Sequence, residues 1–317
     1  MTEKIHYIGI DLGGTRIRAG RFDANLEMDA RTETLTLDEE GVDAVIGRMV
    51  AQARAVFPTD GGRVAGIGVS APGPIDPKAG VITSPPNLKG WKNIELRRIL
   101  QEALGAPVFL GNDANLAALA EHQRGAGRGY TDLIYLTIST GVGAGVITDG
   151  RLLIGSHGFG AECGHLIMLV EGEHVSTLEK EAAGPSIARH AVAAIKAGEQ
   201  SAIITFAAND LAEVTAKHVS EAARQGDPLA LRLMGRTGKI IGCGIVSLLH
   251  TFNPQIVVIG GGVYKGASDL LNPAMNDAIR AYSIGAEYWR DLVIAPAALG
   301  EDVCLIGAAA LAVGGGN

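Results

Sequence analysis

Cysteine and aromatic residues are scarce in this chain of 317 residues. Its three cysteines, Cys163, Cys243 and Cys304, form an odd and widely spaced set, which excludes a disulfide framework and a cysteine-rich metal site. We expect them to behave as small buried hydrophobic residues in a reducing compartment. Because only 4% of the residues are aromatic, the core must be built from aliphatic side chains.

Positive charge and long apolar runs are also lacking. The formal net charge is −7, which argues against a nucleic-acid partner. A membrane-spanning helix needs roughly 20 apolar residues, whereas the run 240–252 is interrupted by His250 and stopped by Asn253-Pro254. Residues 1–4 lead straight into an expected strand without a signal peptide. We therefore expect a cytoplasmic protein with no membrane partner.

Glycine, in contrast, is abundant, with 44 residues. Two glycine-rich turns follow apolar strands, one at residues 11–15 (Asp-Leu-Gly-Gly-Thr) and one at 139–143 (Ser-Thr-Gly-Val-Gly). Such turns can aim backbone N–H groups and hydroxyls at phosphate oxygens, and their repetition predicts two similar half-molecules that hold a nucleotide. The first turn is not a Walker loop, because no Gly-Lys-Ser/Thr follows. A strand rather than a helix comes after it, unlike in a dinucleotide fingerprint.

Hydrophobic patterning predicts strands that alternate with helices. Strands are expected at 5–10, 16–22, 64–69, 107–110, 133–138, 143–148, 255–259 and 292–294. Helices are expected at 44–56, 93–104 with Asn93 as the N-cap, 114–122, 185–197, 211–225, 228–251 and 304–313. This alternation predicts an α/β protein of two lobes with mixed sheets. We expect a small N-terminal lobe, residues 1–115, on which the helix at about 304–317 packs, and a large lobe, residues 116–303.

Asn112-Asp113 ends one of the expected strands, where ligands of α/β sheets gather. A carboxylate at that place can accept the proton of a substrate hydroxyl that attacks phosphorus. Asp113 could equally cap the helix that follows, and the two roles are compatible.

Three further motifs allow a functional and a structural interpretation. Glu162, His165 and Glu179 could hold vicinal hydroxyls, or they could be surface acids and a core histidine. The run Gly260-Gly261-Gly262 after a strand predicts a close backbone approach or a cap. Trp91 could face a sugar, although packing is the more common role of an indole.

Together these segments resemble the ROK family (repressor, open reading frame, kinase) of sugar kinases, within the actin/hexokinase/Hsp70-like ATPase fold. The resemblance covers nearly the whole chain in the family's order. It is carried by residues 11–15, 71–74 (Ala-Pro-Gly-Pro), 87–91 (Asn-Leu-Lys-Gly-Trp), 111–115 (Gly-Asn-Asp-Ala-Asn), 139–143, 162–165 (Glu-Cys-Gly-His), 178–179 and 260–263. It implies a two-lobed fold with a duplicated mixed-sheet core and a cleft between the lobes.

The resemblance also implies roles for individual residues, with ATP and Mg²⁺ as cofactors. Asp113 would be the catalytic base for the 6-hydroxyl of a hexose. Substrate contacts would come from Gly73, Asn87, Asn112, Asp113, Glu162, His165 and Glu179. Cofactor contacts would come from Asp11, Gly13, Gly14, Thr15, Thr140, Gly141, Gly143, Gly261 and Gly262, with Asp11 near Mg²⁺ through phosphate or water. The stretch 87–91 looks most like the glucokinases of the family, and the family suggests a homodimer.

The chain departs from the family pattern in one segment. Many members carry Cys-x-Cys-Gly-x-x-Gly-Cys between the Gly-His and Leu-Glu pairs, and these cysteines bind a structural zinc together with the histidine. Here residues 166–177 contain no cysteine and the segment is short. We therefore expect no zinc site, because the thiolate ligands are missing. His165 could keep a sugar contact, and Glu179 becomes the least secure of the implied residues.

The expected activity is ATP-dependent phosphorylation of glucose to glucose 6-phosphate. Alternatives are a kinase for N-acetylglucosamine, N-acetylmannosamine, mannose or fructose, a sugar-responsive repressor, and an ATPase of the actin/Hsp70 type. Only residues 1–7 precede the expected strand core and the charge is acidic, which disfavours the repressor. The sequence leaves the hexose and the phosphoryl donor (ATP, ADP or polyphosphate) open.

Overall fold

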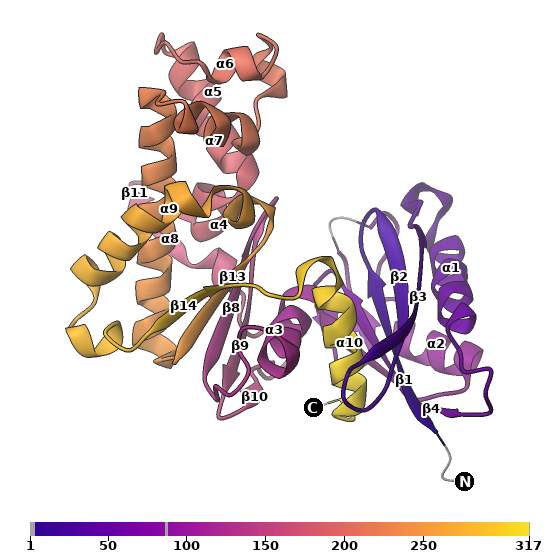
Figure 1. Ribbon diagram of the computed structural model, residues 1–317. Helices are drawn as coiled ribbons and strands as arrows, with labels where there is room; N and C mark the ends of the chain where they lie inside the picture. The colour runs from indigo at the N-terminus through magenta and orange to yellow at the C-terminus, as the bar shows by residue number, and fades with distance from the viewer. Residues whose placement is uncertain (1–3, 86–87, 317) are drawn as a thin grey trace. The chain divides into compact units, whose positions relative to one another are not determined.

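The computed structural model describes residues 4–85 and 88–316, which fold as two compact units (Figure 1). Unit 1 comprises residues 1–131, 145–161 and 297–317, and unit 2 comprises 132–144 and 162–296. The expected division into residues 1–115 and 116–303 stays a prediction.

Two five-stranded mixed sheets form the framework. The first has the order β3-β2-β1-β4-β7, and the second has the order β10-β9-β8-β13-β14. The strands of the first sheet are β1 (Ile5–Leu12), β2 (Arg16–Phe22), β3 (Met28–Leu35), β4 (Arg63–Ala71) and β7 (Val108–Asn112). Those of the second are β8 (Leu133–Ile138), β9 (Val142–Thr148), β10 (Arg151–Leu152), β13 (Ile256–Gly260) and β14 (Val293–Pro296).

The two sheets repeat one pattern, in which parallel strands follow a hairpin. β1 pairs antiparallel with β2 and parallel with β4, and β4 pairs parallel with β7. In the second sheet β13 pairs parallel with both β8 and β14. The duplicated mixed-sheet core expected from the sequence is therefore confirmed.

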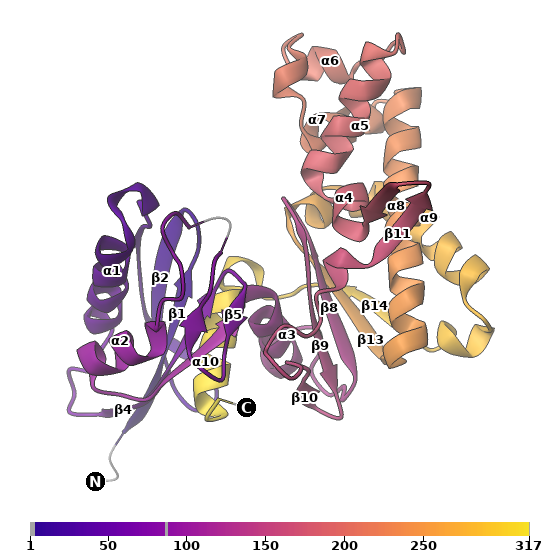
Figure 2. The same cartoon turned by 180° about the vertical axis from the view of Figure 1, so that it is seen from behind.

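Helices cover both faces of the first sheet. They are α1 (Val42–Ala55), α2 (Leu96–Leu104), α3 (Asp113–Arg124) and α10 (Val303–Val313). The side chains of α1 and α2 complete an aliphatic core with β1 and β4, in which Trp91 is also buried, so the packing role of its indole is confirmed. α10 lies on the opposite face and contacts β1, β4 and α3 (Figures 1 and 2). It comes so close that a Cβ at Gly68 would lie 1.7 Å from the carbonyl oxygen of Ala308, which explains a glycine in a central strand.

Unit 2 is mostly helical outside its sheet. Its helices are α4 (Leu178–Ala182), α5 (Gly184–Lys196), α6 (Ile203–Phe206), α7 (Ala216–Arg224), α8 (Pro228–Phe252) and α9 (Gly262–Tyr282). Two small hairpins, one in each unit, complete the strands: β5 (Ile75–Asp76) with β6 (Val81–Ile82), and β11 (Ile167–Glu171) with β12 (His174–Thr177). Short 3-10 helices lie at Asp38–Glu40, Cys163–His165, Leu211–Glu213, Ala286–Tyr288 and Gly300–Asp302.

Two expected helices differ from the sequence prediction. Asn93 does not cap a helix: its φ is 53°, its N–H donates to the carbonyl oxygen of Thr83, and the helix begins at Leu96. The helix expected over 211–225 is broken, because Thr215 accepts a hydrogen bond from the N–H of His218 and so starts α7 at Ala216. In the part of the chain that the structure describes, no helix is both long and apolar enough to cross a membrane.

Candidate functional site

The first glycine-rich turn, residues 11–15 (the first loop), joins β1 to β2 as a tight hairpin. The N–H of Gly13 donates to the carbonyl oxygen of Arg16 at 2.9 Å, and the hydroxyl of Thr36 donates to the carbonyl oxygen of Gly13 at 2.6 Å. Gly14 and Thr15 are exposed at the tip. A fixed turn with an exposed Gly-Thr tip suits close approach by an anion.

Asp11 lies at the end of β1, where negative charge accumulates. Arg18 Nη1 donates to its carboxylate at 3.3 Å. Burial raises the pKa of Asp11 to about 6 against the lowering effect of Arg18, and the nearby charge of Asp113 adds to the rise. Burial and the same two carboxylates also keep the pKa of the Cys304 thiol well above its usual value. The structure thus brings Asp11 and Asp113 together in a place that favours a cation.

Asn112, rather than Asp113, is the N-cap of α3. The side chain of Asn112 accepts a hydrogen bond from the N–H of Ala114 at 3.0 Å, and Asp113 Oδ1 accepts from the same N–H at 2.8 Å. A Cβ at Gly73 would lie 2.8 Å from Asn112 Nδ2, so this glycine packs directly against the side chain of Asn112. Because Asn112 caps the helix, the start of α3 does not depend on the carboxylate of Asp113, which lies directly after β7.

The second glycine-rich turn, residues 139–143 (the second loop), joins β8 to β9. The N–H of Ser139 donates to the carbonyl oxygen of Gly141 at 2.9 Å, and the N–H of Gly184 donates to the carbonyl oxygen of Ser139 at 2.8 Å. A carboxylate oxygen of Glu179, Oε2, accepts from the N–H of Val142 at 3.0 Å. The loop is therefore fixed by α5 and by an acidic side chain of α4.

Glu162 is the N-cap of the 3-10 helix Cys163–His165, and His165 is its last residue. Both are exposed, which rules out the core-histidine interpretation. A Cβ at Gly164 would lie 1.9 Å from the carbonyl oxygen of Val142, so this helix packs directly on the second loop. Burial raises the pKa of Cys163 to about 11, which makes this thiol unreactive. Within unit 2, Glu162, His165 and Glu179 thus border one loop. Asn87 lies outside the described residues.

The glycines after β13 begin α9. Gly261 is its N-cap, and with a φ of 89° it approaches β8 so closely that a Cβ would lie 2.3 Å from the carbonyl oxygen of Ile138. This close approach places Gly262 beside the second loop, and both line one cavity.

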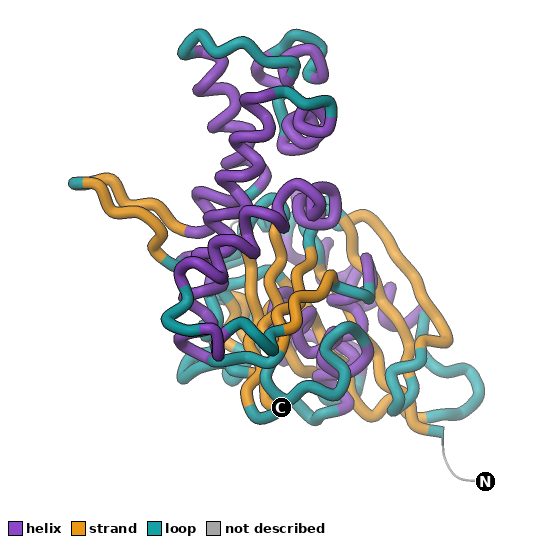
Figure 3. The backbone as a smooth tube through the Cα atoms, turned by 60° about the vertical axis from the view of Figure 1, so that its left-hand side comes forward, coloured by secondary structure: helices purple, strands orange, loops and turns teal. Residues whose placement is uncertain are grey.

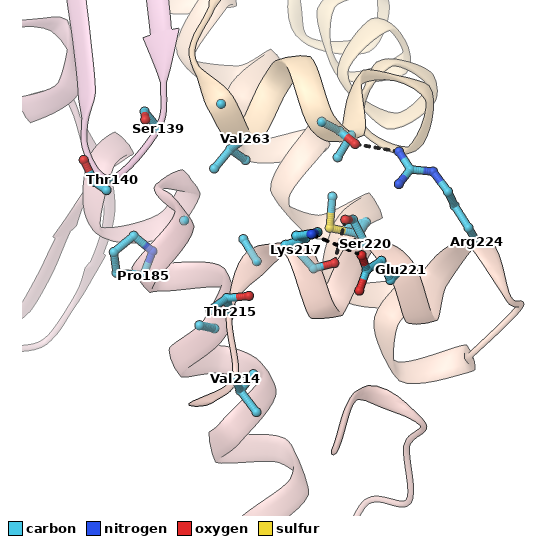
Figure 4. Close-up of a pocket in the computed structure, with 17 residues that line it drawn as sticks. Ser139, Thr140, Pro185, Val214, Thr215, Lys217, Ser220, Glu221, Arg224 and Val263 are labelled. Carbon is cyan, nitrogen blue, oxygen red and sulfur yellow. Dashed lines mark hydrogen bonds and ion pairs between the residues drawn. The ribbon is translucent and has the colours of Figure 1, made fainter. Parts of the chain in front are cut away.

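That cavity has a volume of about 750 Å³, which is the usual size of a small-molecule site. Figure 4 shows Ser139 and Thr140 on one side of it and Lys217, Glu221 and Arg224 on the other. Apolar residues form most of the wall between them: Pro185, Ala188, Val214, Ala216, Met234, Val263 and Ala267. Sequence reasoning missed these wall residues, because they come from separate segments of the chain and share no motif. Of the cavity, it found Gly262 and the second loop.

Comparisons with known proteins show the family of this chain. Residues 7–314 match the model of the ROK family. The chain belongs to the ROK family. Among ROK relatives, it is 34% identical over 313 residues to a glucokinase of Thermotoga maritima, which covers 97% of both chains.

Solved ROK structures also superpose on nearly the whole chain. A ROK hexokinase from Thermus thermophilus has 37% identity and a TM-score of 0.84, and covers 97% of each chain. A ROK glucokinase from Streptomyces griseus, solved with glucose and AMPPNP, has 30% identity and a TM-score of 0.78, and covers 97% of this chain and 99% of its own. The two-lobed actin-like ATPase fold expected from the sequence is thereby confirmed.

Proposed function

We propose that this ROK protein transfers the γ-phosphoryl group of ATP to the 6-hydroxyl of glucose. The relatives support the class, a sugar kinase of the glucokinase type. The choice of glucose rests on the resemblance of residues 87–91 and on the glucokinases among the relatives. A kinase for another hexose or an amino sugar is the alternative, because one or two hydrogen bonds decide such specificity.

The cavity beside the second loop carries the proposal most directly. The hydroxyl-bearing residues Ser139 and Thr140 border one end, where phosphates would lie. The apolar wall, including Pro185 and Val263, suits the flat faces of a nucleoside. A polyphosphate chain would gain nothing from this wall, so we propose ATP as the donor.

Asp113 is the proposed base. Its carboxylate takes the proton of the 6-hydroxyl while the hydroxyl oxygen forms a bond to the γ-phosphorus and the bond to the departing ADP breaks. Glu162, His165, Glu179, Asn112 and Asn87 orient the sugar in this proposal. Most of the rate comes from positioning, because phosphoryl transfer needs little covalent help from the protein.

The acidic pair fits a divalent cation. Burial and Asp113 raise the pKa of Asp11, so a positive charge there would relieve an unfavourable concentration of carboxylates. We propose that Asp11 orients Mg²⁺ through phosphate or water. Mg²⁺, when bound with ATP, neutralises phosphate charge. Gly14 and Thr15 of the first loop contribute hydrogen-bond donors to the same phosphates.

The test is to identify donor and product together. Purified protein with Mg-ATP and glucose is expected to form glucose 6-phosphate, detected with a dehydrogenase specific for that product, while ADP and polyphosphate give little. Efficient turnover with polyphosphate would overturn the proposal that ATP is the donor, and a product phosphorylated elsewhere would overturn the role of the 6-hydroxyl.

We also propose that the protein is a cytoplasmic homodimer whose product enters glycolysis. Light scattering tests the dimer.

A further inference from the structure

The segment between His165 and Gly184 has to be fastened without the zinc that the family resemblance implies. Its residues do not fit that metal: 166–177 offer no thiolate, and in the ranges that the structure describes no three His, Cys, Asp or Glu side chains are grouped as metal ligands. The segment instead folds as the β11–β12 hairpin followed by α4 (Figures 2 and 3). The hairpin exposes Ile167 and Val170, so its own packing holds it weakly.

A buried carboxylate stands where this segment meets the helices. Glu181 of α4 is 4% exposed. The hydroxyl of Ser176 on β12 donates to Glu181 Oε1, Arg236 Nη2 of α8 donates to Oε2, and His190 Nε2 of α5 lies 3.4 Å from Oε2. We call Ser176, Glu181, His190 and Arg236 the Glu181 cluster. It ties the hairpin and α4 to two long helices at one point.

The residues of the Glu181 cluster are coupled through the charge of the Glu181 carboxylate. Burial by itself would raise the pKa of Glu181, but Ser176, Arg236 and His190 outweigh it and hold the pKa below its usual value. Burial and the neighbouring Arg236 lower the pKa of His190, while the carboxylate of Glu181 acts in the opposite direction. If Arg236 were removed, a charged carboxylate would stay buried without its main partner, which is strongly unfavourable.

The same short helix reaches the second loop. Glu179, two residues before Glu181, accepts the N–H of Val142 with its side chain at 3.0 Å. Its backbone carbonyl oxygen accepts from the N–H of Ala183 and from the hydroxyl of Ser186 at 3.1 Å. The N–H of Gly184, just after α4, donates to Ser139 of the loop at 2.8 Å. α4 thus holds one end of the loop through Glu179, and the start of α5, which follows α4 directly, holds the other end through Gly184.

We propose that the Glu181 cluster fastens this segment without a metal, and that Glu181 and Arg236 are positioning residues which hold the second loop in its phosphate-binding shape through Glu179. The proposal deepens the proposed function, because it rests on the second loop as a phosphate site. Neither residue touches the substrate; each acts through α4.

Hydrogen exchange at the loop tests the proposal without any activity. Peptides that cover residues 139–144 are compared in wild type, Glu181→Gln and Arg236→Met. Loss of the cluster frees Glu179 from Val142, so we expect exchange in this peptide to be about tenfold faster in both variants. Arg236→Lys keeps a charge and restores part of the protection. Unchanged exchange in folded variants would overturn the proposal.

The matched control is Arg232→Met. Arg232 lies one turn earlier on α8 and pairs with Glu199, but both side chains are exposed, so the pair contributes little. We expect loop exchange and AMPPNP affinity to stay at wild-type values in this control, and affinity to fall about tenfold in Arg236→Met. Equal losses in both variants would overturn the proposal. If Arg236→Met does not fold, Ser176→Ala, which removes one neutral donor, is expected to accelerate exchange to a smaller extent, and no acceleration contradicts the cluster's role.

Metal analysis tests the second part of the proposal, that the segment is fastened without a metal. We expect far less than one zinc per chain in purified protein, and an unchanged melting temperature after dialysis against a chelator. A stoichiometric zinc whose removal lowers the melting temperature contradicts a metal-free fastening. Failure of the proposed function has a different signature: wild-type protein would not bind AMPPNP, or would not phosphorylate glucose, while loop exchange would still respond to Glu181→Gln.

Discussion

At the residue scale, the proposed chemistry depends most on Asp113, because it combines a strand-end position with a charge that the helix start does not require. Asn112 caps α3, and an asparagine at 113 could still accept the N–H of Ala114. For Asp113→Asn we therefore expect intact folding, glucose affinity within about threefold of wild type, and a kcat lower by about 10³-fold, because only the base is lost.

Steady-state kinetics and calorimetric glucose titration check this prediction. Near-normal turnover in Asp113→Asn would contradict the assignment of Asp113 as the base. A loss of glucose binding together with turnover would instead make Asp113 a substrate-binding residue.

Gly141 is the residue that lets Glu179 reach the second loop. A Cβ at this position would lie 2.6 Å from Glu179 Oε2, so the carboxylate would have to move away from the N–H of Val142. For Gly141→Ala we expect AMPPNP affinity to fall about tenfold with little change in melting temperature, because Glu179 is only half-buried and its displaced carboxylate can bind water instead. Calorimetric titration measures the affinity. Unaltered binding means that the contact does not shape the loop.

Sequence reasoning works at this scale where a motif is local. Asp11, Asp113 and the glycines of both loops were selected because their neighbours in the chain explain them. The contact between Glu179 and Val142 joins positions 37 apart, and no local pattern encodes it. Asn93 was misassigned for a related reason: its left-handed backbone follows from pairing with Thr83, which outweighs the capping preference of asparagine.

At the element scale, long periodic helices and buried strands were predicted well, and short or polar ones were not. β3 was missed because its outer face is exposed and it lacks an apolar run. The β11–β12 hairpin was not among the predicted strands. α9 was missed because two glycines and a proline, Gly262, Gly266 and Pro273, lie inside it. The fold of residues 166–177, which stand where many family members bind zinc, could therefore be described only from the structure.

The Glu181 cluster predicts a pH dependence of stability. Because the pKa of Glu181 is lower in the folded chain than its usual 4.5, its charge stabilises the fold above about pH 4.5, and this contribution is lost as the pH falls through the lower folded value. Arg236 and His190 face it from α8 and α5. For Glu181→Gln we expect unfolding free energy to fall by about 1–3 kcal/mol at pH 7.

Denaturant titrations at pH 7 and pH 3 check this: the difference between wild type and Glu181→Gln should shrink at pH 3. A difference that is equal at both pH values would show that the charge of Glu181 does not stabilise the fold.

Gly47 offers a stabilising change in α1. It is exposed, and a Cβ there would meet no atom within 4 Å. For Gly47→Ala we expect a gain of about 0.5–1 kcal/mol in unfolding free energy, because alanine loses less backbone entropy in a helix. Activity should not change, since the added methyl group would contact neither loop. A destabilised variant in chemical denaturation contradicts this description of α1.

At the scale of the whole molecule, two sheets of the same topology each carry a glycine-rich loop at the same place. The two strand orders correspond position by position, and a glycine-rich turn follows the central strand of each, β1 and β8. This correspondence was predictable from two copies of one motif, and the family match over residues 7–314 agrees with it. Which hexose is phosphorylated depends on a few hydrogen bonds, and Asn87, one of the implied sugar contacts, lies outside the described residues.

One measurement tests the account most directly: a coupled ADP-release assay with Mg-ATP and glucose, mannose, fructose, N-acetylglucosamine or N-acetylmannosamine, with a no-sugar control. We predict kcat/KM for glucose at least about tenfold above every other sugar, and negligible ADP release without sugar. Release of ADP at one rate regardless of sugar, or turnover of an amino sugar well above glucose, would contradict the account.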